Sequence, residues 1–288
     1  MPRPKKTAKK VLVADDDRTL RYAVSKLLSA AGYAVTSARD GAEALRKIKR
    51  GSFDLVFLDI WMPRMSGLEV LAHVRAAAVR PKVVVMTSDD TPETLLRAVR
   101  EQAYEYISKP FPPKDVVTMA RRALAEDSLP PVEVISAKPH WVELLVPCDR
   151  GAAERIHSLL LHLKADLPDD VRDSVAQAFR ELLLNAVEWG GKLDPNRKVR
   201  IAYVRSPGLL MYRIADPGGG FTFQGLTHAA VGQPPEKPID HVAVREQHGI
   251  RPGGFGILMI KASVDELLYN ELQNEVLFIK YLPRPGQA

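Results

Sequence analysis

Residues 10–125 alternate short runs of β-branched and aliphatic residues with longer segments whose apolar positions recur at helical spacing. Thr19–Ala31 is one such helical segment, with Leu20, Val24 and Leu28 on one face. The runs that predict strands are Val11–Ala14, Ala34–Ser37, Leu55–Leu58, Val83–Met86 and Tyr104–Ile107. Five strands that alternate with helices predict an α/β fold with a doubly wound, parallel, five-stranded sheet.

The pattern changes after residues 127–140, a proline-containing stretch that we interpret as a linker or a strand leading into a second domain. Residues 141–288 group their helices and strands, which predicts an α+β sandwich. The predicted helices are Arg150–Lys164, Asp169–Trp189 and Gly256–Lys261, and the predicted strands are Trp141–Val146, Lys198–Arg205, Leu209–Ala215, Val264–Asn270 and Glu275–Tyr281. We therefore expect a basic disordered tail at 1–9, a first domain at 10–126 and a second at 141–288.

Composition places the chain among globular proteins, with 46% hydrophobic and 26% charged residues. The net charge of +6 lies partly in the first ten residues, which hold five basic side chains. A single cysteine, Cys148, excludes an internal disulfide framework and a cysteine-based zinc cluster. No apolar run approaches the roughly 20 residues of a membrane span, and no secretory signal follows the basic start. We expect a cytoplasmic protein that does not enter a membrane.

Polar residues follow the predicted strands of the first domain. Asp15 and Asp16 end the first strand, Asp59 the third and Thr87 the fourth, and Lys109 comes after the fifth. The carboxyl ends of parallel strands meet at one edge of the sheet, so these side chains should converge. Carboxylates held together repel one another unless a cation neutralises them, and such hard oxygen ligands suit Mg²⁺. The lysine and the hydroxyl match the oxygens of a phosphoryl group.

The motifs VLVADDD, LVFLDIWMPRMSGLEV, VVVMTSDD and YEYISKPF carry these residues. Together they resemble the receiver domain of two-component response regulators. The resemblance implies that Asp59 accepts a phosphoryl group from an upstream sensor histidine kinase. It further implies that Thr87 and Lys109 contact the phosphoryl oxygens and that Tyr106 is the aromatic side chain that swings inward on activation.

The same resemblance implies a Mg²⁺ site formed by Asp15, Asp16, the Asp59 carboxylate and the backbone carbonyl of Trp61. Trp61 departs from the polar residues that are common two positions after the phosphoacceptor. We hypothesise that its indole shields the acyl phosphate from water and prolongs the signal.

The second domain carries a polar helical face and two glycine clusters. Glu181, Asn185 and Glu188 are spaced i, i+4 and i+7, which places them on one face of an α-helix. Asp216–Phe221 follows a predicted strand, and Gly253–Ile257 opens a predicted helix. Glycines in such places let the backbone approach phosphates, and a helix N-terminus offers N–H donors.

FRELLLNAVEWGG followed by these glycine clusters resembles the GHKL-type, or Bergerat-type, ATP-binding fold of gyrase, a heat-shock chaperone and histidine kinases. Within this fold, the segment ELLLNAVEWGG is most similar to the anti-sigma-factor serine kinases. The resemblance implies that Asn185 coordinates Mg²⁺ on ATP, that Asp216 accepts a hydrogen bond from the adenine amine, and that Glu181 is the general base. The glycines implied to approach the nucleotide are Gly218, Gly220, Gly254 and Gly256. Phe221–Pro252 is the expected ATP lid, and Trp189 stands where that family often has histidine.

These resemblances imply a response regulator, phosphorylated on Asp59, that controls a serine kinase or anti-sigma-type switch. Its protein target would be an anti-sigma antagonist or a sigma factor. One alternative is a non-catalytic module that binds ATP only to shape a partner surface. Another is an atypical histidine kinase that uses His157 or His162, although their helix is too short for two dimerisation helices. A homodimer is compatible with both families, and without a helix-turn-helix pattern we expect no direct DNA binding.

Overall fold

A computed structural model of the 288-residue chain describes residues 8–77, 81–89, 91–125, 130–162, 167–222 and 256–282. The chain divides into two compact units, Met1–Leu129 and Pro130–Ala288. The stretch 127–140 contributes a strand, β6 (Glu133–Lys138), to the second unit. Among the described residues, no helix is both long enough and apolar enough to cross a bilayer.

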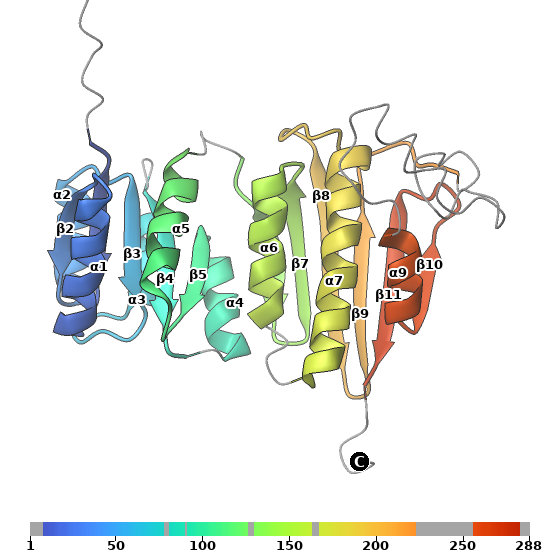
Figure 1. Ribbon diagram of the computed structural model, residues 1–288, viewed down its shortest axis with the longest axis horizontal. Coiled ribbons are helices and arrows are strands. Elements are labelled where there is room, and N and C mark those ends of the chain that lie inside the picture. The colour runs from blue at the N-terminus through green and yellow to red at the C-terminus, as the bar shows by residue number, and fades with distance from the viewer. Residues whose placement is uncertain are drawn as a thin grey trace, which may run out of the picture. The chain divides into compact units, whose positions relative to one another are not determined.

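The first unit contains a five-stranded parallel sheet in the order β2-β1-β3-β4-β5, which confirms the predicted α/β class. Helices α1 and α5 lie side by side on the face turned toward the viewer in Figure 1. The elements are β1 (Lys10–Ala14), α1 (Arg18–Ala30), β2 (Ala34–Ala38), α2 (Gly41–Arg50), β3 (Leu55–Asp59), α3 (Gly67–Arg75), β4 (Lys82–Thr87), α4 (Pro92–Arg100), β5 (Glu105–Ser108) and α5 (Pro113–Ala125).

Burial explains why the predicted strands of this unit are continuous apolar runs. Strand β3 is buried at all five positions, because a central parallel strand is covered on both faces. The loops that follow the strands are fixed by helix caps. The Asp17 carboxylate caps α1, and Ser66 and Glu69 form a reciprocal capping box at α3. The carboxyl ends of the strands therefore hold their polar residues in defined positions.

The second unit contains a six-stranded antiparallel sheet in the order β10-β11-β9-β8-β7-β6. Helices α6, α7 and α9 lie next to one another on one face of this sheet (Figure 1). This arrangement confirms the predicted α+β class. The remaining elements are β7 (Trp141–Pro147), α6 (Arg150–His162), α7 (Asp169–Asn185), the π-helix η1 (Ala186–Gly190), β8 (Lys198–Ser206), β9 (Leu209–Ala215), α9 (Gly256–Ser263), β10 (Glu266–Tyr269) and β11 (Glu275–Tyr281).

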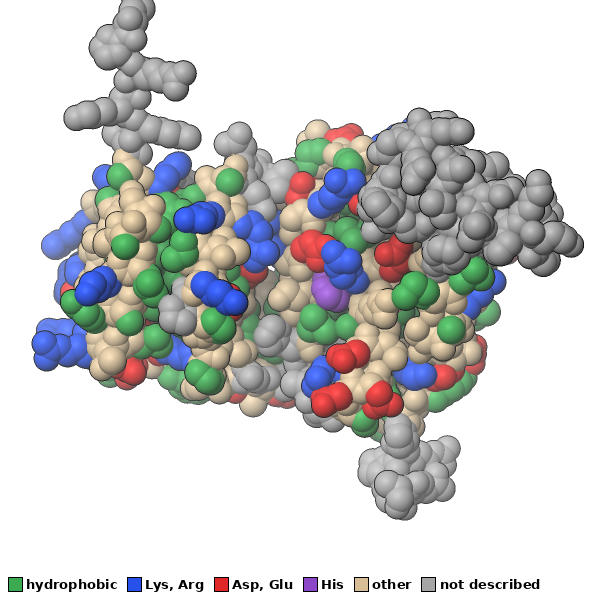
Figure 2. All heavy atoms as spheres, in the orientation of Figure 1, with side chains coloured by type: hydrophobic (Ala, Val, Ile, Leu, Met, Phe, Trp, Pro, Cys, Tyr) green, Lys and Arg blue, Asp and Glu red, His purple; other side chains and the backbone are tan. Residues whose placement is uncertain are grey.

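Four aromatic side chains form the centre of this second core. Tyr212 packs against Phe179 of α7, Tyr203 of β8 and Phe278 of β11, with ring centroids 5.0, 5.1 and 4.9 Å apart, and all four are buried. Aromatic side chains bury large apolar areas, so this cluster anchors α7 to the sheet. Acidic side chains gather at the N-terminal end of α7, as Figure 2 shows in red. There they interact favourably with the helix dipole.

One predicted helix ends differently from expectation. The sequence predicts a continuous α-helix over Asp169–Trp189, whereas α7 ends at Asn185 and continues as the π-helix η1. A π-helix closes its hydrogen bonds over five residues, so its side chains no longer follow the 3.6-residue period. This change of period decides which side chains reach the cavity described below.

Candidate functional sites

Three carboxylates meet at the carboxyl edge of the parallel sheet. Asp15, Asp16 and Asp59 offer oxygens that all lie within 4.8 Å of one another, and Asp15 and Asp59 are buried. The ammonium group of Lys109 lies 2.8 Å from Oδ2 of Asp15 and 3.0 Å from Oδ2 of Asp59. The structure thus brings together Lys109 and the three carboxylates that the sequence placed at this edge.

The charges at this edge are only partly balanced. Burial raises the pKa of Asp59 to about 6 although Lys109 opposes the shift, and burial also raises the pKa of Asp15. Burial alone would lower the pKa of Lys109, but its contacts with the two carboxylates raise it above the ordinary value. Three carboxylates facing one ammonium group leave an excess of negative charge that a divalent cation would neutralise. Their all-oxygen donor set fits Mg²⁺.

Asp89 connects Thr87 and Tyr106, two of the predicted residues of this site. Its backbone N–H donates to Oγ1 of Thr87 at 3.1 Å, and its carbonyl accepts a hydrogen bond of 2.9 Å from the Tyr106 hydroxyl. Thr87 and Tyr106 are both buried, so Tyr106 lies inward in this structure. Asp89 belongs to the motif VVVMTSDD, but its residue type alone indicated no role for it.

Trp61 connects two loops of the site. Its backbone N–H hydrogen-bonds to the Asp59 carboxylate, and its indole hydrogen-bonds to the Asp89 carboxylate. The side chain is nevertheless 59% exposed. Trp61 therefore links the loops that follow β3 and β4 while most of its surface faces solvent.

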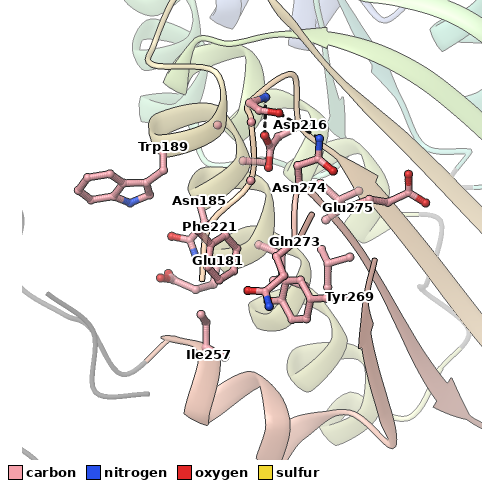
Figure 3. Close-up of a pocket in the computed structure, with 18 of the residues that line it drawn as sticks. Glu181, Asn185, Trp189, Asp216, Phe221, Ile257, Tyr269, Gln273, Asn274 and Glu275 are labelled. Carbon is pink, nitrogen blue, oxygen red and sulfur yellow. Dashed lines mark hydrogen bonds between the residues drawn. The ribbon is translucent and has the colours of Figure 1, made fainter. Parts of the chain in front are cut away.

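The second unit contains a cavity of about 520 Å³ (Figure 3). Its walls come from α7, η1, the loop after β9, the start of α9 and the β10–β11 hairpin. A volume of this size is typical of small-molecule sites, which range from roughly 300 to 1,000 Å³. The cavity is also lined by carboxylate, amide and backbone groups that can match a nucleotide.

Helix α7 and the π-helix that follows it present three polar or aromatic side chains to the cavity. Glu181 and Asn185 line it one turn apart, as the sequence predicted. Glu188 does not; its carboxylate instead pairs with Arg150 at 2.9 Å. The π-helix shifts the period after Asn185, so Trp189 lines the cavity in its place and is 46% exposed.

Asp216 lies at the end of β9 on the opposite wall. Its Oδ1 accepts a hydrogen bond of 2.7 Å from the N–H of Gly218, and its own N–H donates to the Asn274 carbonyl at 2.8 Å. Burial raises the pKa of Asp216. A Cβ at position 190 would lie only 2.1 Å from Oδ1 of Asp216, so Gly190 provides the space for this carboxylate. The sequence analysis quoted Gly190 in NAVEWGG but gave it no role.

The predicted glycines also let the cavity walls approach one another. A Cβ on Gly256 would lie 2.4 Å from Oε1 of Glu181, and one on Gly220 would lie 1.6 Å from the Leu272 carbonyl. Gly220 also has a φ of +84°, which favours glycine. Gly218 is held through its backbone, and its carbonyl accepts a hydrogen bond from Asn274 at 3.0 Å. Gly254 and residues 223–252 of the expected lid lie outside the described residues.

The β10–β11 hairpin turn is a wall that the sequence did not reveal. Tyr269, Gln273 and Asn274 line the cavity from this turn. The N–H of Phe221 donates to the Leu272 carbonyl at 3.2 Å, and the Phe221 and Tyr269 rings meet edge to face at 5.8 Å. Asn270–Asn274 separates two strands as an ordinary polar turn would, so nothing in its composition indicated a binding role.

Comparisons with known proteins agree with both halves of the chain. Residues 11–121 match the response regulator receiver domain family, and residues 150–280 match the histidine kinase-like ATPase domain family. The DNA-binding response regulator MtrA of Mycobacterium leprae is 32% identical over 182 residues, which cover 63% of this chain and 79% of that protein. The DNA-binding transcriptional regulator NtrC of a Bradyrhizobium species is 37% identical over 116 residues, or 40% of this chain and 24% of that protein.

Solved structures match the first half. The chemotaxis response regulator CheY4 of Vibrio cholerae is 34% identical, with a TM-score of 0.39, and covers 41% of this chain and 100% of its own. A CheY-like receiver domain protein from Methanospirillum hungatei is 28% identical, with a TM-score of 0.40, and covers 41% of this chain and 95% of its own. From the family matches and the MtrA relative, the chain belongs to the response regulators, with a receiver domain followed by a histidine-kinase-like ATPase domain.

Proposed function

We propose that phosphorylation of Asp59 controls the C-terminal ATP-binding domain, and that this domain acts as a serine kinase or anti-sigma-type switch on a protein partner. The observation that best supports kinase chemistry is the position of Glu181. Its carboxylate lines the cavity one helical turn before Asn185, across from Asp216 (Figure 3). The proposed general base Glu181, the proposed metal ligand Asn185 and the proposed adenine contact Asp216 thus line the same cavity.

Each residue of the cavity has a role in this proposal. Asp216 would accept a hydrogen bond from the adenine amine, and Asn185 would hold the Mg²⁺ that accompanies ATP. The backbone at Gly256, where α9 begins, offers N–H groups to the phosphates. Bound Mg·ATP supplies the phosphoryl group that is transferred. Glu181 would take the proton from the serine hydroxyl, whose oxygen would bond to the γ-phosphorus as the bond to the β-phosphate oxygen breaks and ADP leaves.

The receiver domain provides the input. An upstream histidine kinase donates a phosphoryl group to Asp59, and Lys109 and Thr87 contact its oxygens. The Lys109 ammonium group would stabilise the negative charge of the transferring phosphoryl group, and a cation held at this site would add to that stabilisation. The groups that hold Mg²⁺ in this proposal are Asp15, Asp16, Asp59 and the Trp61 carbonyl.

Replacing Glu181 by glutamine separates catalysis from binding. We expect E181Q to bind Mg·ATP with the affinity of the wild type but to lose transfer of labelled γ-phosphate to serine on anti-sigma antagonist proteins of the same organism. General-base loss typically costs about 10²–10⁴-fold in rate. E188Q is the matched control, because Glu188 follows Asn185 by three residues but pairs with Arg150 and does not line the cavity.

Failure of the wild type to transfer phosphate, together with intact ATP binding, would contradict the kinase and favour a non-catalytic ATP-dependent module. MtrA and NtrC are DNA-binding regulators, whereas here a histidine kinase-like ATPase domain spans residues 150–280. We therefore expect the output to be read by a protein partner and not by DNA.

A further inference from the structure

The β10–β11 turn contains a glutamine in a conformation that usually belongs to glycine. Gln273 has a φ of +59°, and its N–H donates to the Asn270 carbonyl at 3.0 Å. Hairpin turns commonly place glycine at such a left-handed position, since a side chain there is strained. Strained residues of this kind concentrate at ligand sites, where the surrounding structure holds them in place.

The turn that holds Gln273 is closed by its own hydrogen bonds. The N–H of Asn270 donates to the Glu275 carbonyl at 3.1 Å, and its side-chain amide donates to Oδ1 of Asn274 at 2.8 Å. The N–H of Glu275 donates to Oδ1 of Asn270 at 3.1 Å. The backbone from which the Gln273 side chain projects is therefore held by the protein itself.

The Gln273 side chain points into the nucleotide cavity. In Figure 3 it projects from the hairpin, apart from the Asp216 carboxylate at the end of β9. Its Oε1 is buried, and within the described part of the chain this atom has no hydrogen-bond partner. A buried amide oxygen without a partner is destabilising, so a ligand donor at this point would be favoured.

The chemistry of ATP identifies that donor. N1, N3 and N7 of adenine are acceptors, so the neutral donors of ATP are the two N–H groups of the adenine amine and the two ribose hydroxyls. Asp216, on the other wall, is proposed to take the amine, which places both amine N–H groups away from the Gln273 side chain. We infer that Oε1 of Gln273 accepts a hydrogen bond from a ribose hydroxyl and that the site thereby selects ribonucleotides over deoxyribonucleotides. This inference rests on the ATP site proposed above.

Titration of the full-length chain with Mg·ATP, Mg·2′-deoxyATP and Mg·3′-deoxyATP tests the inference by calorimetry. We expect the wild type to bind one of the deoxynucleotides about tenfold more weakly than ATP, the upper end for one neutral hydrogen bond. Q273G should bind ATP as weakly as the wild type binds that deoxynucleotide and should no longer discriminate. The choice between the two deoxynucleotides identifies the hydroxyl.

Gln102 provides a matched control. It is a glutamine with a φ of +60° in the receiver domain, so Q102G relieves the same backbone strain away from the cavity. We expect both variants to melt at a higher temperature than the wild type, while only Q273G loses discrimination. A glutamine retained for stability alone would instead give a Q273G variant that melts lower and discriminates as before.

Two results would overturn the inference while leaving the ATP site intact: equal binding of all three nucleotides by the wild type, or unchanged discrimination in Q273G. Absence of ATP binding in the wild type would instead contradict the proposed function itself, and this inference with it.

Discussion

Lys109 neutralises only part of the charge that Asp15 and Asp59 bring into a buried position. Its ammonium group contacts both carboxylates, yet burial still raises the pKa of Asp59 to about 6. A buried carboxylate that is costly to keep charged is stabilised by a nearby cation, and an acyl phosphate, which carries more negative charge, needs that cation and Lys109 for the same reason. At the scale of single residues, Lys109 therefore supplies part of the positive charge that the proposed phosphorylation of Asp59 requires.

Cys148 illustrates the opposite case, a titratable side chain that the fold keeps inert. Its thiol is fully buried, and a Cβ at position 191 would lie 2.2 Å from its sulfur. Burial raises the pKa of Cys148 to about 11, above the ordinary value of roughly 8.5.

We predict that Cys148 makes folding stability fall as pH rises from about 8.5 to about 11. In that window the unfolded thiol loses its proton and the folded one keeps it, so the unfolded state is favoured. Denaturant unfolding of wild type and C148A at pH 7.5 and pH 9.5 measures the effect. C148A should lose less stability between the two pH values. The same loss in both proteins would show that this thiol titrates normally.

At the scale of elements, Trp61 links the loops after β3 and β4 through Asp59 and Asp89. We predict that W61N shortens the lifetime of the Asp59 phosphate several-fold, because water gains access to the acyl phosphate when the indole is removed. The measurement is loss of label after phosphorylation with acetyl phosphate. W141N is the control, since Trp141 is an exposed tryptophan of the other domain. An unchanged lifetime in W61N would refute the shielding role.

The contact between the π-helix η1 and the loop after β9 depends on Gly190. We predict that G190A lowers the affinity for Mg·ATP at least tenfold, because its methyl group would displace the Asp216 side chain. G219A is the control for the fold: a Cβ on Gly219 has no neighbour within 4 Å, so its melting temperature should match the wild type. Wild-type affinity in G190A would mean that Asp216 does not contact the nucleotide.

The elements differ in how well the sequence predicted them. The buried strands of the receiver domain are local signals, and each begins and ends within about one residue of the predicted bounds. The π-helix did not follow from the pattern, because Glu188 keeps α-helical spacing while the fold turns it toward Arg150. The left-handed backbone of Gln273 could not be predicted, because it is imposed by the hairpin and not by the residue type. Tertiary packing decides both features.

At the scale of the whole molecule, the chain contains one domain suited to receive a phosphoryl group and another suited to bind ATP. The motifs identified both families, because each site needs several residue types together, at set positions along the chain. The sequence does not specify how the state of one site reaches the other. If the two sites are coupled, the coupling is reciprocal and is typically worth about 1–3 kcal/mol.

The most direct test of this coupling is calorimetric titration of Mg·ATP into the full-length chain with and without beryllofluoride, which mimics phosphorylated Asp59. We predict that beryllofluoride changes the ATP affinity by about 5- to 150-fold and that D59N abolishes the change. The same ATP affinity with and without beryllofluoride would contradict the claim that Asp59 controls the nucleotide site.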